Sequence, residues 1–174
     1  NNVYALALRG DVYGDRGDYE KALMDLDKAI KLDPNYVFAL AVRGYVHKDK
    51  EDYEKALIDF NKAIESNPNY AYALAGRGDV YKEKEEYENA LVDLNKAIEL
   101  DPNYAYALAR RGCVYGNRGE YDKALMDLDK AIKLDPSDDY ALAVRDKVQK
   151  ELAQASEDSN TMDARTPSSS GPRR

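Results

Sequence analysis

The chain has 174 residues, of which 34% are charged, and its formal net charge is −7 at pH 7. A chain this acidic is a poor match for a phosphate backbone, so we expect no nucleic-acid partner. No apolar run is long enough to span a bilayer, so we expect no membrane partner either.

The single cysteine and the start of the chain bear on where the protein works. Cys113 is alone, which excludes an intrachain disulfide and a cysteine-rich zinc site and favours a reducing compartment. We therefore expect a cytoplasmic protein. No initiator Met or signal peptide is visible, and Asn1-Asn2 fit the final places of a preceding repeat, as in a chain cut from a longer array. A targeting segment missing from the printed sequence stays an open alternative.

The first 36 residues contain two apolar stripes separated by a polar turn. Apolar residues recur at intervals of three and four in a stripe that begins at Leu6 and in another that begins at Ala22. The polar break at 14–18 lies between them. This pattern predicts a first helix, the A helix, near 3–16 and a second, the B helix, near 19–32.

The two-helix pattern returns every 34 residues, which indicates a repeat array. The first and last units agree at 26 of 34 positions, a similarity typical of recent duplication or of a consensus-like design. We expect eight repeat helices, with A and B helices alternating. The units are 3–36, 37–70, 71–104 and 105–138.

A proline closes each unit. Proline cannot continue the B helix but suits the first turn of the next helix, with the preceding Asp or Asn as its cap. We therefore expect each Asp-Pro or Asn-Pro pair to start the following A helix. The prolines are Pro34, Pro68, Pro102 and Pro136.

After the fourth unit the pattern continues for one more helix. Asp146 and Gln149 replace the small Gly and the packing Tyr of the other A helices, so the surface they form does not suit a further helix. We expect 138–155 to be a capping helix that ends the array. Residues 156–174 are rich in Ser and Pro and lack apolar periodicity, so we expect a disordered tail there.

Counting each unit from place one to place 34, small residues recur at three places. They are Gly at eight (Gly10, Gly44, Gly78, Gly112), Ala at twenty (Ala22, Ala56, Ala90, Ala124) and Ala at twenty-seven (Ala29, Ala63, Ala97, Ala131). With Tyr at seventeen and Pro at thirty-two, the pattern resembles the tetratricopeptide repeat.

The resemblance implies an all-α fold over residues 1–155. Four helix-turn-helix hairpins and a C-terminal capping helix would form a tetratricopeptide-repeat solenoid, wound as a right-handed superhelix. It also implies a non-enzymatic protein-protein interaction module, whose A helices line a concave groove that binds a peptide segment of a partner.

Two charges recur beside the buried stripes, Arg at place seven and Asp at place twenty-three. An unpaired charge there would be costly, so we expect structural ion pairs between the A and B helices, each made by a bidentate fork. An arginine ladder that binds carboxylates or phosphates is the less favoured alternative. The sequence leaves open whether Asp93 meets Arg77 or Arg111. The residues are Arg9, Arg43, Arg77, Arg111 and Arg145, with Asp25, Asp59, Asp93 and Asp127.

The resemblance places the groove on one face of the A helices, and place two on that face is aromatic in all five. Aromatic side chains offer a large contact area at little entropic cost. Alternatively, this row packs against Tyr36, Tyr70 and Tyr104, two residues earlier. Candidate groove residues are Tyr4, Phe38, Tyr72, Tyr106 and Tyr140 at place two, Asp11, Tyr45 and Asp79 at place nine, and Arg110 at place six.

Charge on the same face favours a basic or apolar-aromatic peptide over an acidic one. Chaperone adaptors of the family clamp a C-terminal carboxylate, but of their clamp residues only Arg110 is matched, so binding of a chaperone tail is disfavoured. The acidic residues are Asp11, Asp15, Asp49, Asp79 and Glu83, with Lys48 and Lys82 as partial offsets.

No catalytic, metal-binding or cofactor-binding pattern is present in the sequence. His47 and Cys113 lack partners at suitable spacing, and calcium-, phosphate- and dinucleotide-binding motifs are absent. We therefore expect neither an enzyme nor a cofactor.

The alternative function is a structural or self-associating scaffold, and so a homo-oligomer. Place twenty-two, on the B helices, is apolar in all four units. If exposed, this B-helix row would let copies of the chain associate; if not, its residues pack under the neighbouring A helix. The row is Met24, Ile58, Val92 and Met126.

Overall fold

The computed structural model describes residues 2–163, with side chains up to residue 158, and this part contains nine helices and no strand. None of these helices combines the length and apolar character needed to cross a membrane. The helices are α1 (Val3–Asp15), α2 (Tyr19–Leu32), α3 (Val37–Asp49), α4 (Tyr53–Ser66), α5 (Ala71–Glu83), α6 (Tyr87–Leu100), α7 (Ala105–Asn117), α8 (Tyr121–Leu134) and α9 (Asp139–Asp163).

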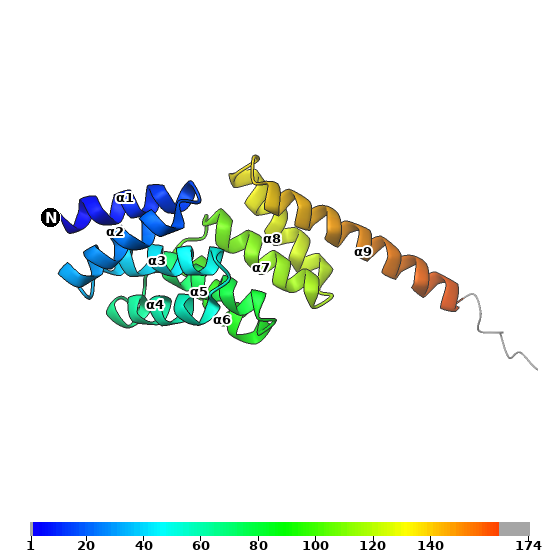
Figure 1. Cartoon of the computed structure of the whole chain (residues 1–174). Helices are drawn as coiled ribbons and strands as arrows, with labels where there is room; N and C mark the ends of the chain where they lie inside the picture. Colours follow the sequence, from blue (N-terminus) through cyan, green and yellow to red (C-terminus); the bar gives the residue numbers. More distant parts are fainter. Residues whose placement is uncertain (1, 164–174) are drawn as a thin grey trace, which may run out of the picture.

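The helices form four hairpins, α1/α2 to α7/α8, stacked in chain order (Figure 1). Each B helix also packs on the next A helix, and successive A helices contact one another. The ninth helix, α9, covers the last hairpin and then extends away from the array (Figure 1). The expected all-α architecture, with helix bounds within a residue or two of those predicted for the first repeat, is confirmed.

The Gly at place eight lets the two helices of each hairpin approach closely. A methyl group on Gly78 would lie 2.8 Å from Cγ of the fully buried Leu94, and the other three glycines face equivalent side chains at 2.7 to 2.8 Å. Larger residues there would overpack the core. The facing residues are Leu26, Phe60, Leu94 and Leu128.

The prolines do not start the A helices, contrary to our expectation. Asp33 is the C-terminal cap of α2, its carboxylate accepts a hydrogen bond from the backbone N–H of Asn35 at 3.1 Å, and Tyr36 occupies the N-cap place of α3. Pro34 therefore lies in a turn between the helices. The carboxylate stabilises this turn and so does not cap the next helix.

The capping helix is longer than the predicted 138–155. α9 continues to Asp163, because the chain from 156 to 163 contains no Pro or Gly to end it, and the side chain of Gln154 donates to Asp158 at 3.2 Å one turn later. The start of the expected disordered tail was therefore placed too early. The rest of that prediction, 164–174, lies outside the described residues.

Candidate functional site

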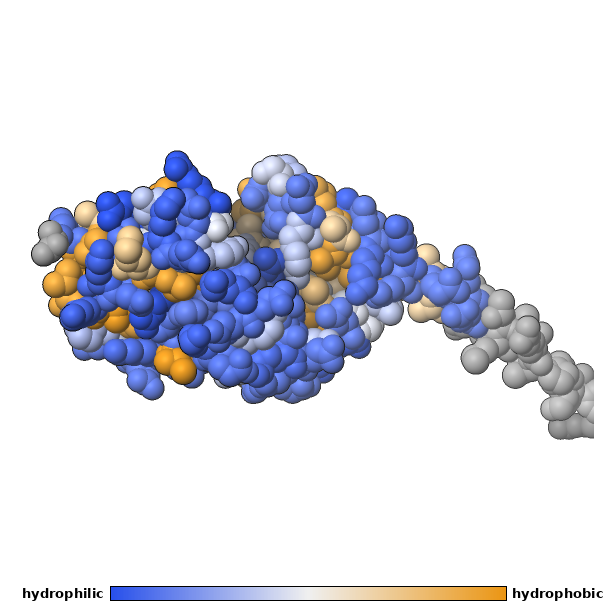
Figure 2. All heavy atoms as spheres, viewed as in Figure 1, coloured by the Kyte–Doolittle hydropathy of each residue, from blue (hydrophilic) through white to orange (hydrophobic). Residues whose placement is uncertain are grey.

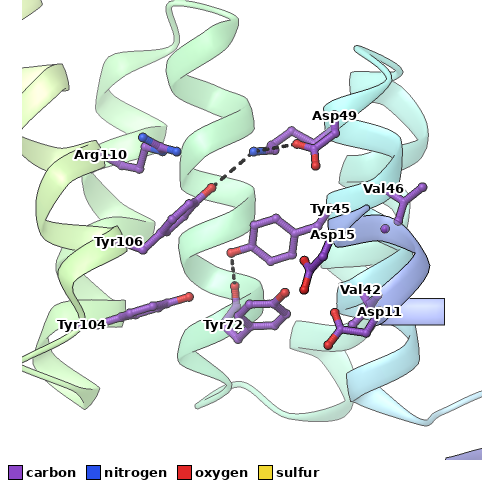
Figure 3. Close-up of a pocket in the computed structure, with 12 residues that line it drawn as sticks. Asp11, Asp15, Val42, Tyr45, Val46, Asp49, Tyr72, Tyr104, Tyr106 and Arg110 are labelled. Carbon is purple, nitrogen blue, oxygen red and sulfur yellow. Dashed lines mark hydrogen bonds and ion pairs between the residues drawn. The ribbon is translucent and has the colours of Figure 1, made fainter. Parts of the chain in front are cut away.

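A pocket of about 500 Å³ opens between α1, α3, α5 and α7 (Figure 3). The surface is hollowed between the N-terminal hairpin and the C-terminal part of the array (Figure 2). We name this pocket the tyrosine pocket after four of the residues that line it, Tyr45, Tyr72, Tyr104 and Tyr106.

The tyrosines hold one another in place. The ring centroid of Tyr45 lies 4.5 Å from that of Tyr72 and 5.9 Å from that of Tyr106. The hydroxyl of Tyr45 donates to the backbone carbonyl of Tyr72 at 2.9 Å. Burial raises the pKa of Tyr45 and of Tyr106 well above 10, so both stay neutral at physiological pH. The part of the pocket wall that these tyrosines form is therefore aromatic and uncharged.

Beside this wall lies a buried carboxylate, Asp79, which is 2% exposed. Its oxygens lie 2.7 Å from Nζ of Lys82, 3.1 Å from Nζ of Lys48 and 3.2 Å from Nε of Arg110, and the hydroxyl of Tyr106 donates to it at 2.6 Å. Burial by itself would raise the pKa of Asp79, but the three cations hold it far below its usual value. We call these five residues the Asp79 cluster.

Arg110 joins the cluster to the last aromatic residue of the predicted row. Its guanidinium lies 4.4 Å from the ring centroid of Tyr106 and 3.6 Å from that of Tyr140. Lys82 in turn lies 3.1 Å from the Tyr140 hydroxyl. Burial raises the pKa of Tyr140 to about 12. The cations of the cluster are thus neutralised by Asp79 and covered by aromatic rings.

On the opposite side of the pocket, α1 contributes two carboxylates, Asp11 and Asp15 (Figure 3). Within residues 2–158, no hydrogen bond or ion pair engages either side chain. Partial burial, and then the charge of Asp15, raises the pKa of Asp11. The uncompensated charge of the pocket is therefore negative.

The structure separates the predicted groove residues into three groups. Tyr72, Tyr106, Tyr45, Asp11 and Arg110 line the tyrosine pocket. Asp79 was expected on the groove surface and is instead buried behind it, because three cations converge on it.

The ends of the aromatic row lie outside the pocket. Tyr4 is 65% exposed and its ring centroid lies 5.2 Å from that of Tyr36, while Phe38 lies 6.1 Å from the same ring. The alternative of packing against the tyrosine two residues earlier holds for Phe38, and Tyr72 and Tyr106 make the same contact with Tyr70 and Tyr104 at 6.1 and 6.0 Å, whereas Tyr4 packs on the last residue of its own repeat. Tyr104, named from the sequence only as a packing partner, both contacts Tyr106 and lines the pocket, because place thirty-four of one repeat lies beside place two of the next.

The Arg–Asp pairs are present and join each Arg to the Asp of its own repeat, which settles the open choice for Asp93. Nε and Nη2 of Arg77 donate to the two oxygens of Asp93 at 2.7 and 2.8 Å. The other bidentate pairs are Arg9–Asp25, Arg43–Asp59 and Arg111–Asp127, with distances of 2.6 to 2.9 Å.

The third guanidinium nitrogen reaches the preceding repeat. Nη1 donates at 2.6 to 2.8 Å to a residue at place twenty-five, so each of these arginines joins two hairpins and uses all three of its nitrogens in contacts within the array. The contacts are Arg43–Asp27, Arg77–Asn61 and Arg111–Asn95. Among the side chains that the structure describes, the contacts of Arg145 are longer, 3.7 Å to Asp129 and 3.8 Å to Asp146.

The B-helix row is exposed. Met24, Ile58, Val92 and Met126 are 51%, 65%, 69% and 66% exposed, so they do not pack under the neighbouring A helices. His47 lies 4.0 Å from Asp59, and burial lowers its pKa. Its side chain is 12% exposed.

Models of known families match most of the array. Residues 3–36, 37–70 and 105–138 match models described as tetratricopeptide repeat, and residues 78–119 match one described as TPR repeat. No curated protein sequence matches the chain significantly.

Solved structures show the same fold. PilF of Pseudomonas aeruginosa is 23% identical with a TM-score of 0.76, over 87% of this chain and 69% of that one. The first TPR of Spaghetti (RPAP3), bound to the HSP90 peptide SRMEEVD, is 22% identical with a TM-score of 0.62, over 67% and 93%. YrrB, described as a TPR protein with an unusual peptide-binding site, is 25% identical with a TM-score of 0.64, over 87% and 78%.

Proposed function

Because the chain belongs to the tetratricopeptide repeat family, we propose that it is a non-enzymatic interaction module that binds a peptide segment of a partner in the tyrosine pocket. The observation that carries the proposal is the pocket itself. It is an open cavity of about 500 Å³, lined by aromatic side chains and a few charged groups. Both its size and its lining are typical of ligand sites.

The charges of the pocket favour a peptide with a Lys or Arg side chain. Lys48 and Arg110 are already paired with Asp79, whereas Asp11 and Asp15 have no partner in the described part of the chain. A cation bound between these carboxylates and the tyrosine rings would gain both ion pairing and cation–π contact, about 0.5–2 kcal/mol for the latter. Apolar or aromatic neighbours in the peptide would cover the rest of the wall.

An acidic peptide such as the one bound by the RPAP3 domain suits the pocket less well. Its carboxylates would meet Asp11 and Asp15, and the nearest cations are neutralised by Asp79. We therefore propose a ligand class opposite in charge to SRMEEVD.

Binding of peptide libraries to the full chain tests this proposal. Fluorescence anisotropy against basic, acidic and apolar-aromatic sets should give the tightest binding in the basic or mixed basic-aromatic set. The affinity of the best basic peptide should fall roughly tenfold for the Asp11→Asn, Asp15→Asn variant, and more for the Tyr72→Ala, Tyr106→Ala variant.

The matched control removes two negative charges far from the pocket. Asp122→Asn with Glu157→Gln changes two exposed residues of α8 and α9 and should leave the affinity unchanged. If both double carboxylate variants weaken binding equally, the effect is one of net charge and the pocket assignment is wrong. Binding that survives the loss of both tyrosines in a folded variant contradicts the proposal outright.

A self-associating scaffold is the second candidate, favoured by the 51–69% exposure of the B-helix row. Copies of the chain would then contact one another through this row. Light scattering over a concentration series tests it, because a strict monomer excludes self-association. A dimer that Met24→Glu with Met126→Glu dissociates would support this row as the contact.

A further inference from the structure

The side chain of Arg110 is held by a carboxylate and two aromatic rings. Its Nε lies 3.2 Å from the carboxylate of Asp79, and its guanidinium lies 4.4 Å from the ring centroid of Tyr106 and 3.6 Å from that of Tyr140. A planar guanidinium can pair with a carboxylate at its edge while its faces stack on aromatic rings. We call these four residues the Arg110 site. They show how this scaffold binds an arginine side chain.

The same four places recur two repeats earlier, at the tyrosine pocket. The carboxylate and both aromatic rings are kept there, whereas a valine stands in place of the arginine. In the order carboxylate, arginine, first ring and second ring, the places are taken by Asp11, Val42, Phe38 and Tyr72.

Three of these residues, Asp11, Val42 and Tyr72, line the tyrosine pocket. Figure 3 shows Asp11 beside Val42, on the side of the pocket that faces Tyr72. Tyr72 packs against the apolar cluster that contains Val42, and burial, followed by the charge of Asp11, raises the pKa of Tyr72. Because valine is shorter than arginine, the volume that a guanidinium would take is left to the pocket. We call this volume the open arginine place.

The open arginine place is formed by residues from Asp11 onward, whatever precedes the first repeat. Lys48, the partner that Asp79 receives from the preceding repeat, makes a separate contact. Its Nζ lies 3.1 Å from the carboxylate of Asp79, and Arg110 binds beside it. A cation supplied to Asp11 in the same way would therefore leave the open arginine place available.

The lysines of the Asp79 cluster approach these rings less closely than Arg110 does. Nζ of Lys82 lies 5.1 Å from the ring centroid of Tyr140, and Nζ of Lys48 lies 5.9 Å from that of Tyr106. Both ammonium groups also lie near the hydroxyls of those tyrosines, at 3.1 and 3.4 Å. A place between a carboxylate and a ring face therefore favours a flat guanidinium over a compact ammonium group.

We propose that the open arginine place binds a guanidinium group, which the bound peptide supplies with an arginine side chain. The inference rests on the proposed function and narrows its ligand from a basic peptide to one that contains arginine. The guanidinium pairs with Asp11 and stacks on Tyr72, in the same way as Arg110 in its own site. Val42 forms the apolar floor beneath it.

NMR titration of the full chain with N-acetylarginine amide and N-acetyllysine amide tests this inference without a chosen peptide. The arginine amide should shift the signals of the Asp11 carboxyl and the Tyr72 ring, and it should bind roughly fivefold more tightly than the lysine amide. The citrulline amide, which has a similar shape and no charge, should shift them much less. Equal affinities for arginine and lysine overturn the inference, as does an arginine amide that shifts neither signal.

Two pairs of variants locate the binding. Asp11→Asn should remove the preference for arginine over lysine, whereas Asp122→Asn, which removes an exposed carboxylate of α8, should keep it. Tyr72→Phe keeps the aromatic ring and should bind the arginine amide, whereas Tyr72→Leu should bind it roughly fivefold less tightly. A preference for arginine that survives Asp11→Asn in a folded protein contradicts the inference.

A third pair fills the open arginine place from within the chain. Val42→Arg puts an arginine at the place that Arg110 has in its own repeat, and it should weaken binding of the arginine amide roughly tenfold. Val144→Arg adds the same charge at place six of α9, outside the pocket, and should leave binding unchanged. Circular dichroism checks the fold of both variants. A folded Val42→Arg variant that binds the amide as the wild type does overturns the inference.

The peptide libraries separate this inference from the proposed function. If the best peptide of the pocket loses no affinity when its arginines are changed to lysines, the inference is wrong and the peptide-binding function stands. If no peptide of any set binds in the pocket, the proposed function is wrong. The amide titration then decides by itself whether the open arginine place accepts a guanidinium.

Discussion

Asp11 and Asp79 occupy the same place in two repeats and have opposite environments. Asp79 is buried among three cations and a tyrosine hydroxyl, and its pKa is lowered. Asp11 lines the pocket with no ion pair to any side chain of residues 2–158, and its pKa is raised. One carboxylate is thus a structural element, while the other lines the pocket in which we propose that a peptide binds.

The difference comes from neighbouring places, since the two residues are identical. Three partners of Asp79 have counterparts around Asp11 that cannot pair with it. Gly14 stands where Lys82 stands, Val42 where Arg110 stands, and Phe38 where Tyr106 stands. Lys48, the fourth partner, comes from the repeat before that of Asp79. A repeat place therefore has no fixed role, because its partners lie in adjacent repeats.

Removing each carboxylate tests this contrast most strongly. Asp79→Ala leaves three cations close together in a buried site and should lower the free energy of unfolding by about 3–5 kcal/mol. Asp11→Ala should change it by less than about 0.5 kcal/mol, because Asp11 is only half-buried and makes no ion pair or hydrogen bond within residues 2–158. Urea unfolding of both variants measures the two values. Similar losses would show that Asp11 is also a structural residue.

Acid should reveal the lowered pKa of Asp79. Its pKa is lower in the folded than in the unfolded chain, so its contribution to stability is present above about pH 4 and is lost as pH falls through the folded value. Between pH 7 and pH 2, the wild type should therefore lose more stability than Asp79→Asn does. Parallel acid-dependent losses in the two proteins would contradict the ion pairing.

The contribution of Asp11 to stability should depend on pH in the opposite direction, and the effect should be smaller. Its pKa is raised in the folded chain, so its ionised form opposes folding above the folded value and this cost disappears as pH falls. Asp11→Asn should be more stable than the wild type at pH 7, by less than about 1 kcal/mol, and equal to it near pH 3. Thermal melts at the two pH values provide the measurement.

The smallest expected effect comes from giving Asp11 a hydroxyl donor like the one that Asp79 has. Tyr106 donates to Asp79 at 2.6 Å from 27 residues further along the chain, and Phe38 stands 27 residues after Asp11. Phe38→Tyr should therefore place a hydroxyl near Asp11 and lower its pKa. An NMR titration of the Asp11 carboxyl measures the shift. Phe38→Leu, which adds no donor, should not lower it.

The sequence predicted the parts of this structure that depend on local periodicity. Apolar spacing located the helices, and the recurrence of Arg and Asp indicated the ion pairs, which need only one repeat. The burial of Asp79 could not be predicted in the same way, because its partners come from three different repeats. The prediction that Asp33 caps the start of α3 was wrong, because an Asp before a Pro can stabilise either a helix start or a turn.

The arginines that join two hairpins also couple the opening of one repeat to that of the next. When a hairpin unfolds, Arg43, Arg77 or Arg111 loses contacts on both sides, so neighbouring repeats should open together in hydrogen exchange. Arg9 has no such second contact in the described chain, so in a monomer the first hairpin should exchange fastest. Because that hairpin carries Asp11 and Asp15, its opening would dismantle one wall of the tyrosine pocket. If a peptide binds there as proposed, opening of this hairpin gives it one route of release.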